Sequence, residues 1–334
     1  MDVVLRDRRL DVLRGGLILS VVFGHLLETH GGWGWADPPQ RALLTVLYAF
    51  HMPAFVFLTG IHAKADQVPL RIARLVSVLV VFQVLFLAFG WLIGHPIANW
   101  YSPYWVLWYV MAMIWWQALM PLIARFPRAA LLTSVVVAVA VGIVDVHGNW
   151  FAFSRAAVFL PFFIAGYIWG KRAMIALPTA PAGAKAAVGG AFLVGVAVIF
   201  AANGDPHWLF GNWGYQQLGV AVVPGAIGRI GVMAVAATGV VALLMLAPAR
   251  MPVLERPGRH SLAVFLFHVF AVELYAVALG AWGGEAPAAV AVTVAFLTAV
   301  VLTALFSARV FERGCRIVFR LPELRPRRIP VPRA

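Results

Sequence analysis

Ten runs of about 20 mostly apolar residues follow one another along this chain, and they limit its fold more than any other feature. A helix of that length crosses the hydrocarbon core of a bilayer, where every backbone polar group must bond internally. The runs cover residues 10–29, 42–61, 75–94, 104–124, 129–147, 151–170, 187–203, 218–247, 261–281 and 287–308. The sequence therefore predicts an all-α integral membrane protein, built as a bundle of about ten transmembrane helices.

The composition leaves little material for a second domain. Of the 334 residues, 63% are hydrophobic and 12% are charged. An average soluble domain is about half apolar and about a quarter charged. We therefore expect a single transmembrane domain over residues 1–334, ending in a basic cytoplasmic tail at 309–334. The one cysteine, Cys315, excludes an internal disulfide.

The net charge of +13 reads as a topology signal, because the basic residues cluster between the apolar runs. With ten alternating helices, all 26 Lys and Arg residues except Arg41, Arg155 and Arg229 lie on or near one side. The positive-inside rule makes that side cytoplasmic and places both termini there. No nucleic-acid partner is needed to explain the charge, whereas the tail can touch anionic membrane lipids. The Ala-, Val- and Arg-rich composition indicates a GC-rich bacterial genome, and so a multi-pass protein of the bacterial plasma (inner) membrane.

The first apolar run carries a stripe of polar residues. At about 100° per residue, Arg14 and His25 differ by about 20° around the axis, and Asp11 and Glu28 lie within about 60° of His25. Such residues in a membrane span face the bundle interior or a wet cavity. His25 lies roughly 16 Å further along the helix than Arg14. Two plainer readings remain open: an Asp11–Arg14 anchor at the membrane surface, and a structural helix–helix hydrogen bond from His25.

Other polar residues join this pattern. His51 lies near the middle of the second run, and Ser261 and His268, seven apart, share a face of the ninth. Both histidines could equally form helix–helix hydrogen bonds. Arg71 and Arg74, three apart at the start of the third run, suit a phosphate clamp or plain positive-inside charge. The histidine spacings match no metal motif, so we expect no metal site.

Six stretches resemble the acyltransferase-3 family of integral membrane acyltransferases, particularly its fucose 4-O-acetylase-like branch. They are "RRLDVLRGGLILSVVFGH", "YAFHMPAFVFLTG", "RIARL", "YWVLWYVMAMIWW", "FLPFFIAGYIWGKR" and "GRHSLAVFLFH", in the family's order. The spacing from Arg14 to His25 and the Arg71–Arg74 pair fit the family signature. Thr59 replaces a common Ser, and Phe265 stands near a common Tyr. The resemblance implies ten helices, an acyl-CoA donor and an acceptor hydroxyl on a sugar or glycoconjugate.

These observations predict a membrane O-acyltransferase, with acetyl-CoA as the expected donor and cell-envelope carbohydrate as the expected acceptor. His25 is the expected general base, because a neutral imidazole titrates near working pH. The expected catalytic residues are His25, Glu28 and His51; the donor-binding residues are Arg14, Arg71, Arg74 and Asp11; the acceptor-binding residues are Trp108, Tyr109, His268 and Ser261. The donor would enter from the cytoplasm and the acceptor from outside.

Aromatic residues on the predicted outer side could stack on a sugar, although they are common at any membrane interface. They are Trp33, Trp35, Trp100, Tyr101, Tyr104, Trp105 and Trp108. The main alternative to the enzyme is a proton-coupled transporter of a small solute or glycolipid, since buried titratable residues also suit a carrier. A third reading is a catalytically silent scaffold. The sequence leaves the acceptor, the acyl chain length and the oligomeric state open, a homodimer among the options.

Overall fold

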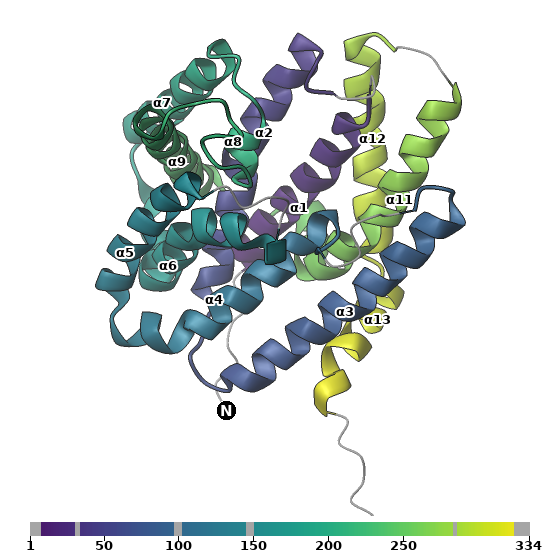
Figure 1. Cartoon of the computed structure of the whole chain (residues 1–334), viewed down its shortest axis with the longest axis horizontal. Coiled ribbons are helices and arrows are strands. Elements are labelled where there is room, and N and C mark those ends of the chain that lie inside the picture. Colours follow the sequence, from purple (N-terminus) through teal and green to yellow (C-terminus); the bar gives the residue numbers. More distant parts are fainter. Residues whose placement is uncertain (1–7, 31–33, 97–101, 145–149, 283–285, 324–334) are drawn as a thin grey trace, which may run out of the picture.

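The structure is a computed structural model that describes residues 8–30, 34–96, 102–144, 150–282 and 286–323. Within these ranges all regular secondary structure is helical (Figure 1). The α-helices are α1 (Arg8–Glu28), α2 (Pro38–Ile61), α3 (Val68–Leu92), α4 (Trp108–Arg125), α5 (Pro127–Ala140), α6 (Phe153–Ala176), α7 (Ala182–Ala201), α8 (His207–Phe210), α9 (Val222–Leu246), α10 (Pro252–Arg259), α11 (Ser261–Trp282), α12 (Ala288–Phe306) and α13 (Arg309–Arg320). The predicted all-α architecture is confirmed.

The described residues contain nine helices that are long and apolar enough to cross a membrane. The fifth predicted span, 129–147, corresponds to a shorter apolar helix, Pro127–Ile143, formed by α5 and one 3-10 turn. At about 1.5 Å per residue it falls a few ångströms short of a roughly 30 Å core. The number of crossings and the side on which the termini lie stay predictions.

Helix α1 lies at the centre of the bundle, packed against α2, α10, α11 and α12 (Figure 1). Thirteen of its 21 residues are buried, whereas α7, at the rim, buries only Phe192 and Val196. A central helix has no lipid-facing side. This position explains how α1 can carry a polar stripe without exposing it to hydrocarbon.

Helices α2 and α6 pack closely through a reciprocal pair of glycines. A Cβ atom at Gly60 would lie 2.0 Å from the carbonyl oxygen of Phe163 on α6. A Cβ atom at Gly166 would lie 2.0 Å from the carbonyl oxygen of Phe57 on α2. Both backbones therefore approach to a distance that only glycine allows, as small residues do between membrane helices.

Besides the short α8, two α-helices lie outside the predicted spans, both at the end of the bundle where α1 begins. Helix α10 packs on the first turns of α1, with Gly258 against the carbonyl oxygen of Asp11. Helix α13 packs against α3 and α11, burying Cys315 and placing the Phe311 ring 4.9 Å from that of Phe267. The described part of the predicted tail therefore begins as an amphipathic helix, of the kind that lies in a membrane interface.

Polar contacts join several helix ends that the positive-inside rule predicts to lie on the cytoplasmic side. The guanidinium of Arg9 donates to the carbonyl oxygen of Met174, at the end of α6, over 3.1 Å. His260 donates to the carbonyl oxygen of Ser307, just after α12, over 2.5 Å. These contacts join the start of α1 to the end of α6, and the junction of α10 and α11 to the end of α12.

Candidate active site

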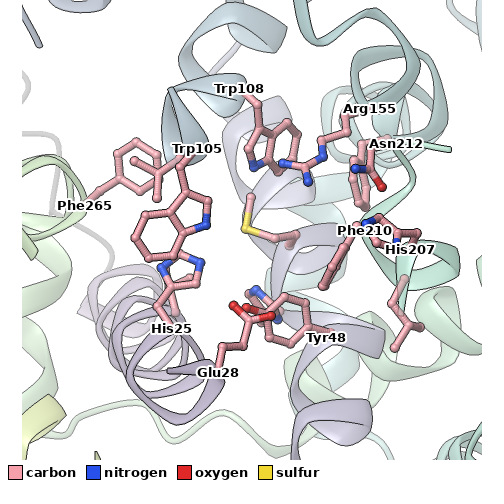
Figure 2. Close-up of a pocket in the computed structure, with 16 residues that line it drawn as sticks. His25, Glu28, Tyr48, Trp105, Trp108, Arg155, His207, Phe210, Asn212 and Phe265 are labelled. Atoms are coloured by element: carbon pink, nitrogen blue, oxygen red, sulfur yellow. The ribbon is translucent and has the colours of Figure 1, made fainter. Parts of the chain in front are cut away.

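A cavity of about 270 Å³, here called the His25 chamber, lies between α1, α2, α6, α8 and the 3-10 turn that leads into α4 (Figure 2). It contains four of the residues predicted for the site: His25, Glu28, His51 and Trp108. The full lining is Val21, His25, Glu28, Tyr48, His51, Met52, Trp105, Val106, Trp108, Arg155, Phe159, His207, Leu209, Phe210, Asn212 and Phe265.

His25 is held by a second histidine. Its Nδ1 lies 2.9 Å from Nε2 of His268, and Nδ1 of His268 lies 3.1 Å from the carbonyl oxygen of Val264. A carbonyl only accepts, so Nδ1 of His268 carries the proton and its Nε2 accepts in turn. His25 then donates through Nδ1. Its Nε2 keeps a lone pair, which is the form that a general base needs.

His268, which was predicted to bind substrate, lies against His25 and does not line the chamber. Its side chain is fully buried at 0% exposure, and its ring stacks on that of His25 with centroids 5.2 Å apart. The other flank of His25 is covered by Trp105, with ring centroids 4.5 Å apart. Trp105 has a φ of 27°, a strained backbone conformation for a residue with a side chain. The imidazole is thus held by contacts on both sides.

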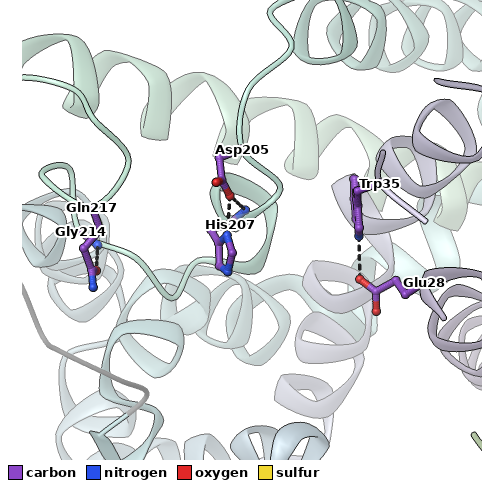
Figure 3. Close-up of polar contacts among 6 residues, drawn as sticks. All are labelled: Glu28, Trp35, Asp205, His207, Gly214 and Gln217. Atoms are coloured by element: carbon purple, nitrogen blue, oxygen red, sulfur yellow. Dashed lines mark hydrogen bonds and ion pairs between the residues drawn. The ribbon is translucent and has the colours of Figure 1, made fainter. Parts of the chain in front are cut away.

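Glu28 enters the chamber from the last turn of α1. Its Oε1 accepts a hydrogen bond of 2.8 Å from the indole nitrogen of Trp35 (Figure 3). Because His268 already engages Nδ1 of His25, the carboxylate does not take the position that an aspartate takes in a catalytic triad. Glu28 therefore faces the chamber as a separate, fixed acceptor.

His51 presents a second imidazole nitrogen to the same space. Its Nδ1 donates to the carbonyl oxygen of Leu47 over 2.6 Å, within α2. The Tyr48 ring lies edge-on against it, with centroids 4.6 Å apart. Nε2 of His51 has no hydrogen-bond partner among the described residues and can accept one from a ligand.

A second cavity of about 150 Å³, the Arg14 chamber, adjoins the first one. It contains the predicted residues Arg14, Tyr109 and Ser261, and the Tyr109 hydroxyl lies 2.5 Å from that of Thr59. The full lining is Arg14, Val21, Met52, Phe55, Thr59, Tyr109, Met113, Ser261, Leu262 and Phe265. Val21, Met52 and Phe265 line both chambers and form the apolar boundary between them, here called the neck.

Three predicted donor-binding residues line neither chamber. Arg71 pairs with Asp66 at 3.0 Å, and Arg74 pairs with Glu323, just beyond α13. Asp11 is buried where α1 meets α10. All three lie toward the end of the bundle where α1 begins. Of the aromatic residues predicted to stack on a sugar, Trp33, Trp100 and Tyr101 fall outside the described residues.

The chamber also contains residues that the sequence did not single out: Tyr48, Arg155, His207 and Asn212. Arg155 drew attention only as an exception to the charge rule. His207 hydrogen-bonds to Asp205 (Figure 3) and stacks on Trp213 with ring centroids 3.5 Å apart. Burial lowers the pKa of His207, although its hydrogen bond to Asp205 opposes the shift. The described residues hold no group of three or more potential metal ligands.

The fold and site define a multi-pass helical membrane protein with a buried imidazole between two adjoining chambers. The chain belongs to the acyltransferase-3 family, whose model, described as an acyltransferase domain, matches residues 7–308. Searches among curated proteins and among solved structures gave no significant match. Family membership makes the protein a membrane acyltransferase that uses an acyl donor.

Proposed function

We propose that the protein moves an acyl group, acetyl in the simplest case, from acyl-CoA to a hydroxyl of a sugar or glycoconjugate. The observation that carries this proposal is the free Nε2 of His25, one helical turn from the neck between two chambers. A reaction between two substrates needs a route to the base for each of them. One chamber can admit the donor and the other the acceptor. The sequence resemblance to the fucose 4-O-acetylase-like branch supports a carbohydrate acceptor in the bacterial cell envelope.

The Arg14 chamber suits the donor. Its walls are mostly apolar, and its polar groups are Arg14, Ser261 and the hydroxyls of Thr59 and Tyr109. Such a lining fits the long thin pantetheine arm of acyl-CoA. The nucleotide phosphates would remain nearer the start of α1. There Arg71 and Arg74 could exchange Asp66 and Glu323 for phosphate oxygens.

The proposed reaction uses the tautomer that His268 imposes. The acceptor oxygen attacks the thioester carbonyl carbon while its proton passes to Nε2 of His25. The carbon–sulfur bond breaks, and the imidazolium gives the proton to the departing thiolate. The products are an O-acyl ester and free CoA thiol. Nε2 of His268 stabilises the transient imidazolium by accepting from its Nδ1.

The direct test is incubation of the purified protein in detergent with radiolabelled acetyl-CoA and a panel of sugars and glycosides. Ester formation, or slow acetyl-CoA hydrolysis that is lost in His25→Gln, supports the enzyme. Sugar flux into proteoliposomes without any covalent change would instead establish a carrier.

Arg14→Ala is expected to weaken donor binding, because the Arg14 chamber loses a charged hydrogen-bond donor to the donor arm. We expect the KM for acetyl-CoA to rise about tenfold or more, with a smaller change in kcat. Steady-state kinetics with acetyl-CoA varied would measure both. Arg128→Ala, an exposed basic residue on α5, is the matched control and should leave the KM unchanged. An unaltered KM in Arg14→Ala would remove Arg14 from the donor site.

His268→Leu is expected to lower kcat about 100-fold, because His25 loses the acceptor that fixes its tautomer. His268→Gln should recover part of that loss, since its amide oxygen can accept from Nδ1 of His25. A merely structural role predicts no such rescue. The KM for acetyl-CoA should stay near wild type in both variants. Equal kcat values for the Gln and Leu variants would contradict the positioning role.

A further inference from the structure

Arg155 is a partly buried cation beside the aromatic ring of Trp108. It lies in the first turn of α6 and reaches into the His25 chamber, where its guanidinium carbon sits 5.0 Å from the centroid of the Trp108 ring (Figure 2). Its Nε is buried and makes no hydrogen bond. No hydrogen bond or ion pair joins Arg155 to any residue in the described part of the chain.

The guanidinium is left short of polar partners. A cation–π contact compensates only part of the desolvation of a cation that is shielded from water. A guanidinium also offers five N–H donors in a planar fork that matches the oxygens of a carboxylate or phosphate. The side chain is thus suited to an oxyanion that the fold itself does not supply.

The nearest carboxylates are already engaged. Glu28 is the only carboxylate among the lining residues, and Trp35 holds its Oε1. Figure 2 shows Glu28 and Arg155 on opposite walls, and they form no ion pair. Asp205 is bonded to the ring and backbone N–H of His207 and does not line the chamber. Neither group fills the guanidinium fork.

The neighbours of Arg155 indicate what else the ligand carries. Oδ1 of Asn212 is also buried and without a partner, so it can accept from a hydroxyl. The rings of Trp108 and Phe210 give the same wall two aromatic surfaces on which a sugar ring can stack. A volume of about 270 Å³ lies just below the range of drug-sized pockets and suits one sugar residue rather than a chain.

We propose that the His25 chamber selects an acidic sugar, whose carboxylate or phosphate is bound by Arg155 while another hydroxyl faces His25. Only the placement of a hydroxyl at His25 rests on the proposed acyl transfer. Binding of the anionic group by Arg155 does not depend on any reaction. Glu28, on the wall away from Arg155, would disfavour the reverse orientation by placing like charges together.

The test compares sugars that differ only in charge. Methyl glucuronide, galacturonide and mannuronide are each paired with the neutral methyl glycoside, and glucose 6-phosphate is paired with glucose. Acyl-transfer rates and thermal stabilisation of the purified protein are measured for every pair. We expect the wild type to favour the acidic member of at least one pair about tenfold or more in kcat/KM. The pair that responds distinguishes a carboxylate from a phosphate.

Arg155→Gln should abolish this preference, and Arg155→Lys should keep part of it, because lysine retains the charge but not the fork. Arg41→Gln is the matched control: Arg41 stacks on Phe200 at 4.4 Å and lines a different cavity, so selectivity should not change. If Arg155→Gln does not fold, the Arg155→Lys variant and the wild-type comparison of acidic with neutral sugars still test the inference. Equal response to both members of all pairs would overturn the inference while leaving acyl transfer intact. Stabilisation by acidic sugars without transfer would support it and contradict the proposed reaction.

Discussion

His25→Gln is expected to lose acyl transfer by about 1,000-fold or more, the largest effect of any substitution in the site. General-base catalysis contributes about 10²–10⁴-fold, and glutamine cannot take a proton at the position of Nε2. The amide can still donate toward His268, so the packing of α1 should survive. Initial rates with saturating acetyl-CoA and the best acceptor would measure the loss, together with the melting temperature.

His30→Gln is the matched control for this change. His30 lies one turn beyond His25, bonds to the Tyr275 hydroxyl over 2.6 Å, and lines neither chamber. The variant should keep activity within about twofold of wild type. Near-wild-type transfer by His25→Gln would refute the assignment of the base.

Gly166→Ala is expected to cause a large loss of stability for the addition of a single methyl group. The added Cβ would meet the carbonyl oxygen of Phe57 at 2.0 Å, and backbone cannot swing aside as a flexible side chain can. The helices must separate, at a cost of about 1–3 kcal/mol or more, as in other overpacked cores. We expect the melting temperature in detergent to fall by several degrees, measured by intrinsic fluorescence.

Gly190→Ala gives the comparison on α7, where an added Cβ meets nothing within 4 Å. There alanine should be neutral or slightly stabilising, because it restricts the unfolded chain and favours the helix. Matching melting temperatures for the two variants would mean that α2 and α6 do not pack as closely as described.

Hydrophobic periodicity was sufficient to predict the polar stripe of α1 and the helices around it. Run length identified the long helices, and the angular positions of Arg14 and His25 placed both on an inward face. The same approach missed α10 and α13, because a search for 20-residue apolar runs passes over short amphipathic helices. In α13 the spacing of Phe311, Cys315 and Phe319 is helical, so that signal was present.

The pairing of His25 with His268 could not be predicted, because the two residues are 243 positions apart. Their contact depends on how α1 and α11 pack, and no local pattern encodes that. Arg155 shows a different limit. Its charge was visible, but whether an arginine at a helix end faces water or a buried chamber depends on the neighbouring helices.

The neck formed by Val21, Met52 and Phe265 also bears on the permeability of the membrane. If the His25 chamber and the Arg14 chamber met through polar groups, they would hold a continuous file of water. That file would conduct protons down the electrochemical gradient. A narrow apolar constriction dewets and interrupts such a file. An uncharged acyl thioester can enter that constriction, whereas a hydrated ion cannot. This apolar junction would let the protein work at the middle of an energised membrane without discharging it.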